Sequence, residues 1–256
     1  MTTMLQITGL SRSFGGIRAV DNVNFETKKG AITGIIGPNG AGKTTLFNVI
    51  SGTLKAGAGE VSLDGKRITQ MSAAAVARQG LVRTFQMTTV FPGCSVYQNL
   101  YRAALFRTFP TPASLLNPMR VFSGRKAAAA AAHHALELID MADLSDSDAG
   151  SLAYGLQKTL GVGMALATQP RMLLMDEPAA GLNPSEKETM SALIAKIHAS
   201  GVDIVLVEHD MKMVMKLCEQ IIVLVNGTQL AAGPAADIRN NPAVIDAYLG
   251  ADLDHA

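Results

Sequence analysis

A nine-residue segment near the start of the chain has the residue types and spacing of a loop that binds phosphate. It fits the pattern G-x-x-x-x-G-K-[ST], and its residues are Gly37, Pro38, Asn39, Gly40, Ala41, Gly42, Lys43, Thr44 and Thr45. Glycines let successive backbone N–H groups turn toward a polyphosphate, Lys43 reaches the β- and γ-phosphates, and the Thr44 hydroxyl ligates Mg²⁺. The flanks predict a buried strand over 31–36 and a helix from residue 45, so we interpret the segment as a P-loop. The alternative is a glycine-rich turn with a chance Lys-Thr pair.

Paired acids follow a second apolar segment. Residues 171–175 are typical of a buried strand, and Asp176 and Glu177 come directly after them. Such a strand downstream of a P-loop is a Walker B element: Asp176 holds the Mg²⁺ shell, and Glu177 faces the water that attacks the γ-phosphate as general base. The alternative is a turn at the end of a strand with two solvated acids.

Two further polar side chains are expected at the same edge of the sheet. The segment 80–86 is an apolar strand that ends in Gln86, and the strand over 202–207 is followed by His209. The carboxyl ends of parallel strands are where α/β sheets place ligands. We therefore favour a γ-phosphate contact for His209, although a lone histidine is usually structural.

The segments before the P-loop predict a small antiparallel sheet. Residues 5–10 and 19–26 alternate in polarity on either side of a turn at Gly15 and Gly16, and 59–66 extends the same sheet. Phe14 lies at this hairpin, where its ring can stack on an adenine; ordinary strand core is the alternative.

The middle of the chain predicts a mostly helical insertion. Prolines at 110, 112 and 118 separate helices expected over 97–107 and 126–141. A hairpin over 221–232 and a helix over 241–250 complete the chain, with 251–256 expected to be a frayed tail. The predicted fold class is α/β: a P-loop NTPase core with a mainly parallel sheet, an N-terminal antiparallel β subdomain and an inserted helical subdomain.

Composition argues against a nucleic-acid-binding, secreted or membrane-spanning protein and against a metal site formed by cysteines. The 256 residues carry a net charge of +1, so bulk charge does not favour a nucleic-acid partner. The two cysteines, Cys94 and Cys218, have no metal-ligand spacing and suit a reducing compartment. No secretory signal or membrane span is evident, which predicts a cytosolic protein.

Taken together, these residues resemble the ATP-binding subunit of an ABC transporter over essentially the whole chain. In that family's terms Phe14 is the adenine-stacking residue, Gln86 is the Q-loop and His209 is the switch histidine. The residues 181–183 look like the D-loop. The branch it resembles most is the one for branched-chain amino acid uptake, because of the segments 91–93, 152–155, 208–211 and 241–250.

The resemblance implies a single ABC ATPase domain over 1–256. Residues 1–86 and 164–256 would form the nucleotide-binding core with its antiparallel β subdomain, and 87–163 the helical subdomain that carries the signature motif. ATP and Mg²⁺ would be the cofactors, with Gln86 joining Thr44 and Asp176 at the metal and Gln86, Glu177 and His209 acting in catalysis.

The resemblance also implies partners. Two ATP-binding subunits, copies or paralogues, would dimerise head to tail, so that Tyr154 and Gly155 of each contact the ATP held by the other. Transmembrane permease subunits and a substrate-binding protein would complete the system at the cytoplasmic face of the inner membrane. The uncharged stretch 87–101, with Phe91, is expected to form part of a groove for a permease helix.

The signature motif departs from the family pattern. In place of Leu-Ser-Gly-Gly-Gln the chain has Leu152-Ala153-Tyr154-Gly155-Leu156, with the amide one place later at Gln157. The departure leaves open a nucleotide-gated binding module that hydrolyses little. The sequence also leaves open urea transport, lipopolysaccharide transport and a non-transport ABC-type ATPase.

Overall fold

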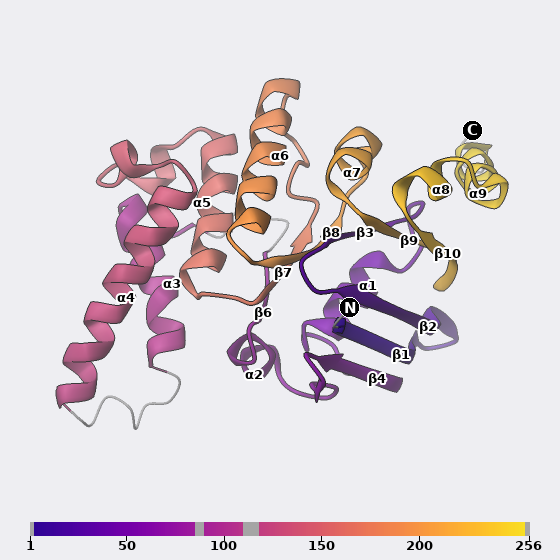
Figure 1. Cartoon of the computed structure of the whole chain (residues 1–256), viewed down its shortest axis with the longest axis horizontal. Coiled ribbons are helices and arrows are strands. Elements are labelled where there is room, and N and C mark those ends of the chain that lie inside the picture. Colours follow the sequence, from indigo (N-terminus) through magenta and orange to yellow (C-terminus); the bar gives the residue numbers. More distant parts are fainter. Residues whose placement is uncertain (1–2, 85–89, 110–117, 254–256) are drawn as a thin grey trace.

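A six-stranded sheet forms the centre of the molecule in the computed structural model, which describes residues 3–84, 90–109 and 118–253 (Figure 1). The strand order is β10-β9-β3-β8-β7-β6. These strands are β3 (Ile32–Ile36), β6 (Leu81–Arg83), β7 (Met172–Asp176), β8 (Asp203–Val207), β9 (Gln220–Val225) and β10 (Thr228–Gly233). All pairs are parallel except β9 with β10, and every residue of β3, β7 and β8 is buried. Their β-branched and aliphatic side chains suit strands covered on both faces.

A four-stranded antiparallel sheet lies beside the central sheet. Its order is β2-β1-β4-β5, with β1 (Thr3–Phe14), β2 (Ile17–Lys28), β4 (Ala58–Leu63) and β5 (Lys66–Arg67). Helix α1 (Lys43–Ile50) shares one hydrophobic core with both sheets, because its Leu46 and Phe47 are fully buried among residues such as Ile7 of β1 and Leu174 of β7. The helix that follows the P-loop is therefore held rigidly between the two sheets.

Helices cover the other face of the central sheet and extend beyond it at one end (Figure 1). Those over the sheet are α6 (Pro184–Ala199) and α7 (Met211–Leu217), and those of the insertion are α3 (Val96–Thr108), α4 (Pro118–Leu138) and α5 (Tyr154–Ala167). The 3₁₀ turns η2 (Ala142–Leu144) and η3 (Ala149–Ser151) connect α4 to α5, and the shorter α2 (Ala73–Arg78) connects β5 to β6. None of the described helices is both long and apolar enough to cross a lipid bilayer.

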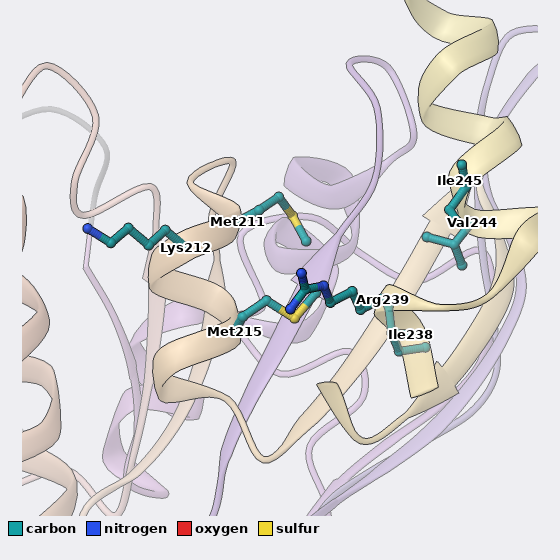
Figure 2. A pocket seen from close by; sticks show the side chains of 7 residues that line it. All are labelled: Met211, Lys212, Met215, Ile238, Arg239, Val244 and Ile245. Atoms are coloured by element: carbon teal, nitrogen blue, oxygen red, sulfur yellow. The ribbon is translucent and has the colours of Figure 1, made fainter. Parts of the chain in front are cut away.

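The C-terminal helices α8 (Ala235–Arg239) and α9 (Pro242–Leu253) pack at the opposite end from the insertion. Together with α7 they form a groove of about 570 Å³, which Figure 2 shows. Its lining is mostly aliphatic and includes Met211, Met215, Ile238, Val244 and Ile245, together with Arg239 and Lys212. Arg239 reaches toward Met215, whereas Lys212 points away from the groove.

The predicted α/β fold is confirmed, with a mainly parallel sheet, an antiparallel sheet and an inserted group of helices. The predicted bounds of two helices were wrong. The last helix continues to Leu253, so 251–253 are helical and not frayed, and the helix expected to begin at residue 126 begins at Pro118. The proposed boundary between residues 163 and 164 falls inside α5.

Candidate nucleotide-binding site

The P-loop joins β3 to α1 and presents the first turn of that helix uncapped. The N-cap residue of α1 is Gly42, with φ of 95°, and no side chain bonds to the free N–H groups of the first turn. A helix N-terminus with free N–H groups attracts anions. Thr44 is exposed in this turn, where its hydroxyl is available to a ligand.

Lys43 folds back over its own loop. Its Nζ donates to the carbonyl oxygens of Gly37 at 2.7 Å and Pro38 at 2.9 Å, and the residue is 6% exposed. An ammonium group has three donors, so one remains that we expect to reach a phosphate. Burial lowers the pKa of Lys43, while the carboxylates of Glu177 and Asp176 act in the opposite direction. The lysine and the paired acids therefore share one electrostatic environment.

Two glycines of the loop are needed because neighbouring strands approach closely. A Cβ on Gly37 would lie 2.1 Å from the carbonyl oxygen of Leu224 on β9, and one on Gly42 would lie 2.1 Å from that of Ala19 on β2. The turn at Gly227 ties the same parts together, since its N–H donates to Ala41 O at 3.1 Å. Both sheets thus fix the shape of the P-loop.

Asp176 ends β7 deep in the protein and is paired with an arginine. Its Oδ2 accepts from Arg83 Nη2 at 2.6 Å, and the two side chains are 2% and 10% exposed. Arg83 also donates to Asn48 on α1, so one side chain links β6, β7 and the P-loop helix. The other oxygen of Asp176, Oδ1, is buried and has no hydrogen-bond partner among the described residues.

Glu177 and His209 meet at the carboxyl edge of the sheet. His209 Nε2 lies 2.8 Å from Glu177 Oε1. The backbone of Glu177 is left-handed, with φ of 49°, a conformation that costs a non-glycine residue about 1–3 kcal/mol. Its N–H donates to Val207 O at 2.9 Å, which holds this turn against β8. Strain of this kind is often found where a side chain must be aimed at a ligand.

Two buried charged residues support this turn, and sequence analysis missed both. Glu208 is 4% exposed and accepts from the N–H groups of Ala179 at 2.7 Å and His209 at 3.0 Å. Lys158 of α5 is 7% exposed and donates to the carbonyl oxygens of Glu177 at 3.2 Å and Pro178 at 3.4 Å. Burial lowers the pKa of Lys158, opposed by the charges of Glu208 and Glu177.

Tyr154 and Gly155 begin α5 and contact the segment 181–186 of the same chain. A Cβ on Gly181 would lie 3.1 Å from Tyr154 Cε1, and one on Gly155 would lie 2.8 Å from Glu186 Oε1. Tyr154 remains 48% exposed. The amide of Gln157 turns inward and donates to Leu152 O at 2.9 Å, so it does not extend from the helix start toward a ligand.

The remaining predicted site residues lie apart from this cluster or outside the described residues. Phe14 is 44% exposed at the end of β1, and the Arg12 guanidinium lies 5.0 Å from its ring centroid. It is therefore not strand core. Gln86 lies outside the described residues, as does the segment 87–89 of the expected groove. Phe91, within that groove, is 46% exposed.

The residues present fit Mg²⁺ and a nucleoside triphosphate. A buried carboxylate oxygen without a partner among the described residues, Asp176 Oδ1, suits a hard cation or the water bound to it. The uncapped first turn of α1 and the buried Lys43 ammonium suit phosphate.

The sequence indicates that Arg83 and Lys158 are buried cations, but it does not identify their partners. Each is a single cation in an otherwise apolar strand or helix, which indicates a buried ion that must be paired. Asp176 lies 93 residues from Arg83 and Glu177 lies 19 from Lys158, so spacing alone does not identify either contact.

Comparison with known proteins gives a consistent result. The family model described as "ABC transporter" matches residues 20–180, and one described as "Branched-chain amino acid ATP-binding cassette transporter" matches 228–254. The high-affinity branched-chain amino acid transport ATP-binding protein BraF of Pseudomonas aeruginosa is 41% identical over 259 residues, covering 96% of this chain and 98% of that protein. LivG of Escherichia coli, with the same description, is 41% identical over 253 residues, covering 96% and 98%.

Solved structures show the same similarity. The ADP conformation of an ATP-binding cassette from an ABC transporter has a TM-score of 0.84 and 31% identity, covering 98% of this chain and all of that chain. A nucleotide-free cassette from an ABC transporter has a TM-score of 0.82 and 31% identity, covering 96% and 98%.

Proposed function

Because the chain belongs to the ABC transporter family, we propose that it is the ATP-hydrolysing subunit of an importer for branched-chain or related hydrophobic amino acids. The observation that carries the proposal is the convergence of Lys43, Asp176, Glu177 and His209 at one edge of the central sheet. The relatives with 41% identity, whose names specify branched-chain amino acid transport, support the substrate class.

We propose a step for each of these residues. The first turn of α1 and Lys43 bind the phosphates, and the charge-assisted contact from the buried ammonium orients the γ-phosphate. Glu177, held by His209 at 2.8 Å, accepts a proton from the attacking water. Bound through Thr44 and Asp176, Mg²⁺ would supply positive charge to the β- and γ-phosphates. The half-exposed ring of Phe14 would stack on adenine.

The site needs a second subunit to be complete. Tyr154 and Gly155 are exposed or half-exposed at the start of α5, where its N–H groups would meet the ATP bound by the opposite subunit. We propose that two such chains, copies or paralogues, dimerise head to tail and dock on permease subunits at the cytoplasmic face of the membrane. Phe91 and its neighbours would take part in that docking, and a substrate-binding protein would deliver the amino acid.

The test is transport by the assembled system. The chain should be co-expressed with the permease subunits and substrate-binding protein of a branched-chain amino acid importer from the same organism, and ATP-driven uptake of labelled leucine into proteoliposomes measured. A complex with Glu177→Gln is the matched control, since it should assemble without transporting. Leucine uptake that requires ATP and Glu177 is the expected result.

Two outcomes would redirect the proposal. ATP hydrolysis stimulated by urea, with no uptake of leucine, would contradict the substrate class but leave the ATPase. Failure to associate with any permease, together with steady hydrolysis, would indicate a non-transport ATPase of the same family.

A further inference from the structure

One stretch in the middle of the chain is basic although the whole chain is nearly neutral. All 21 acidic residues lie outside the 72-residue stretch from Gly65 to Leu136. That stretch contains nine basic residues, which are Lys66, Arg67, Arg78, Arg83, Arg102, Arg107, Arg120, Arg125 and Lys126. Five of the nine belong to the helices α3 and α4, at one end of the molecule (Figure 1). Charge is therefore segregated within the protein.

Large apolar side chains project from the same place. Phe106 near the end of α3 is 40% exposed, and Met119 and Phe122 at the start of α4 are 84% and 77% exposed. The end of α3 packs on the start of α4, because a Cβ on Gly124 would lie 2.6 Å from the ring of Phe109. We call the exposed residues Phe106, Arg107, Met119, Phe122, Arg125 and Lys126 the hairpin tip.

The large apolar residues at the start of α4, Met119 and Phe122, face away from the protein core. Met119, Phe122 and Lys126 are spaced i, i+3 and i+7, which places them on one face of the helix. The buried residues of the same helix, such as Gly124, Ala128 and Ala131, lie on the opposite face. Burial in this subunit therefore does not account for Met119 and Phe122.

The cations of the hairpin tip form no salt bridge within the part of the chain that the structure describes. Arg107, Arg125 and Lys126 are all exposed, and the ion pairs between described residues involve other cations. Nearby, the Arg78 guanidinium lies 5.6 Å from the ring centroid of Phe106. The tip thus combines projecting apolar groups with positive charge.

We propose that the hairpin tip binds the surface of a membrane that contains anionic lipids. Arginine and lysine are attracted to anionic headgroups, while Phe and Met side chains enter the boundary between headgroups and acyl chains. The charge complementarity selects this occupant over a neutral apolar partner. The property goes beyond ATP-driven transport, because the contact needs neither nucleotide nor permease.

Vesicle sedimentation of the full chain tests the proposal. Binding is expected to vesicles with about a third phosphatidylglycerol, to be weak on pure phosphatidylcholine, and to fall when salt rises from about 50 to 500 mM. The triple variant Arg107→Glu, Arg125→Glu, Lys126→Glu should lose at least about a hundredfold in affinity, at roughly fivefold per basic residue removed. The matched control is Lys28→Glu, Lys29→Glu, Arg239→Glu, which changes the same charge at exposed positions elsewhere.

Insertion of the apolar residues gives a second readout. The chain contains no tryptophan, so Phe122→Trp introduces a single fluorophore. Its emission should shift to shorter wavelength on anionic vesicles, whereas Ile17→Trp, at a residue 74% exposed on β2, should not shift. Unchanged thermal unfolding and ATP hydrolysis would show that each variant is folded.

Three results would overturn the proposal. They are equal binding to neutral and anionic vesicles, unchanged binding of the triple variant, and no shift from Trp at position 122. Tip-dependent binding that appears only when permease subunits are present in neutral vesicles would identify a protein-docking surface and also contradict it.

Discussion

The helices α1 and α5 begin in the same way and differ in how their first turns are surrounded. Neither has a side-chain cap: the N-cap residues are Gly42 and Ala153. By contrast α2, α3, α6 and α7 are capped by Ser72, Ser95, Asn183 and Asp210, and among the helices with a described cap only the short α8 also lacks a side-chain cap. Caps satisfy N–H groups that phosphate would otherwise bind. The two expected ATP-binding helices therefore keep those groups free.

Because different groups surround the first turns of α1 and α5, we expect the two helices to have different roles in binding ATP. The first turn of α1 is enclosed by its own lysine, by both sheets and by buried acids, so it can hold a nucleotide within one chain. The first turn of α5 contributes no charged side chain of its own and keeps Tyr154 half-exposed. In the proposed head-to-tail dimer, it would stabilise the ATP bound by the other chain. If the proposal is correct, one subunit holds the residues for hydrolysis but only half of the contacts around each nucleotide.

Glu177 interacts electrostatically with a lysine of each of these two helices, and its replacement should have the largest effect. Both Lys43 and Lys158 experience its charge. Glu177→Gln keeps the side-chain shape and its contact with His209 but removes the base, so turnover should fall by about 10²–10⁴ while ATP still binds. Steady-state hydrolysis and equilibrium ATP binding measure the two effects. Glu219→Gln, an exposed acid elsewhere, is the control; turnover within a few fold of wild type would place the base elsewhere.

Replacing Lys43 tests whether the first turn of α1 binds the nucleotide. Lys43→Ala deletes a charge-assisted contact to phosphate worth roughly 1.5–3 kcal/mol, so affinity for ATP should fall about ten- to a hundredfold and productive binding should be lost. Titration calorimetry compares the variant with Lys28→Ala, which removes an exposed lysine from β2. Wild-type affinity and turnover in Lys43→Ala would contradict the P-loop assignment.

Lys158 tests whether α5 also acts within its own chain. Its ammonium donates to the backbone of Glu177 and Pro178 and supports the left-handed turn that aims the carboxylate. Lys158→Met should lower kcat about tenfold through this loss of orientation, with KM for ATP little changed, and Lys158→Arg should restore much of it. A purely structural role would instead lower thermal stability and leave kcat per folded molecule unchanged.

The residues of the candidate site could be predicted from the sequence where they belong to one short segment with a characteristic pattern. The P-loop and the paired acids at the end of β7 follow from residue type, flank and spacing, and the position of His209 follows because parallel strands end at one edge. The contacts of Arg83 and Lys158 could not be predicted, because they join distant segments of the chain. The inward turn of Gln157 was not predicted either, although its amide donates to the carbonyl of Leu152 only five residues earlier.

The substitution that sharpens the comparison most, because it adds a group and removes none, is at Ala153. A serine there would stand at the N-cap of α5, where its hydroxyl can accept from the first turn and can also donate to the γ-phosphate of ATP held by the opposite subunit. Capping alone would raise the free energy of unfolding by about 1 kcal/mol.

Donation to a charged phosphate would add roughly 1.5–3 kcal/mol, or about tenfold or more in affinity. We therefore expect Ala153→Ser to form the ATP-dependent dimer at a lower ATP concentration, measured by size exclusion in a Glu177→Gln background, where hydrolysis cannot reopen it. Ala236→Ser, at an exposed position on α8, is the control. Higher thermal stability with an unchanged ATP requirement would show that the hydroxyl only caps its own helix, and that Tyr154 and the free N–H groups of α5 already suffice to hold the nucleotide.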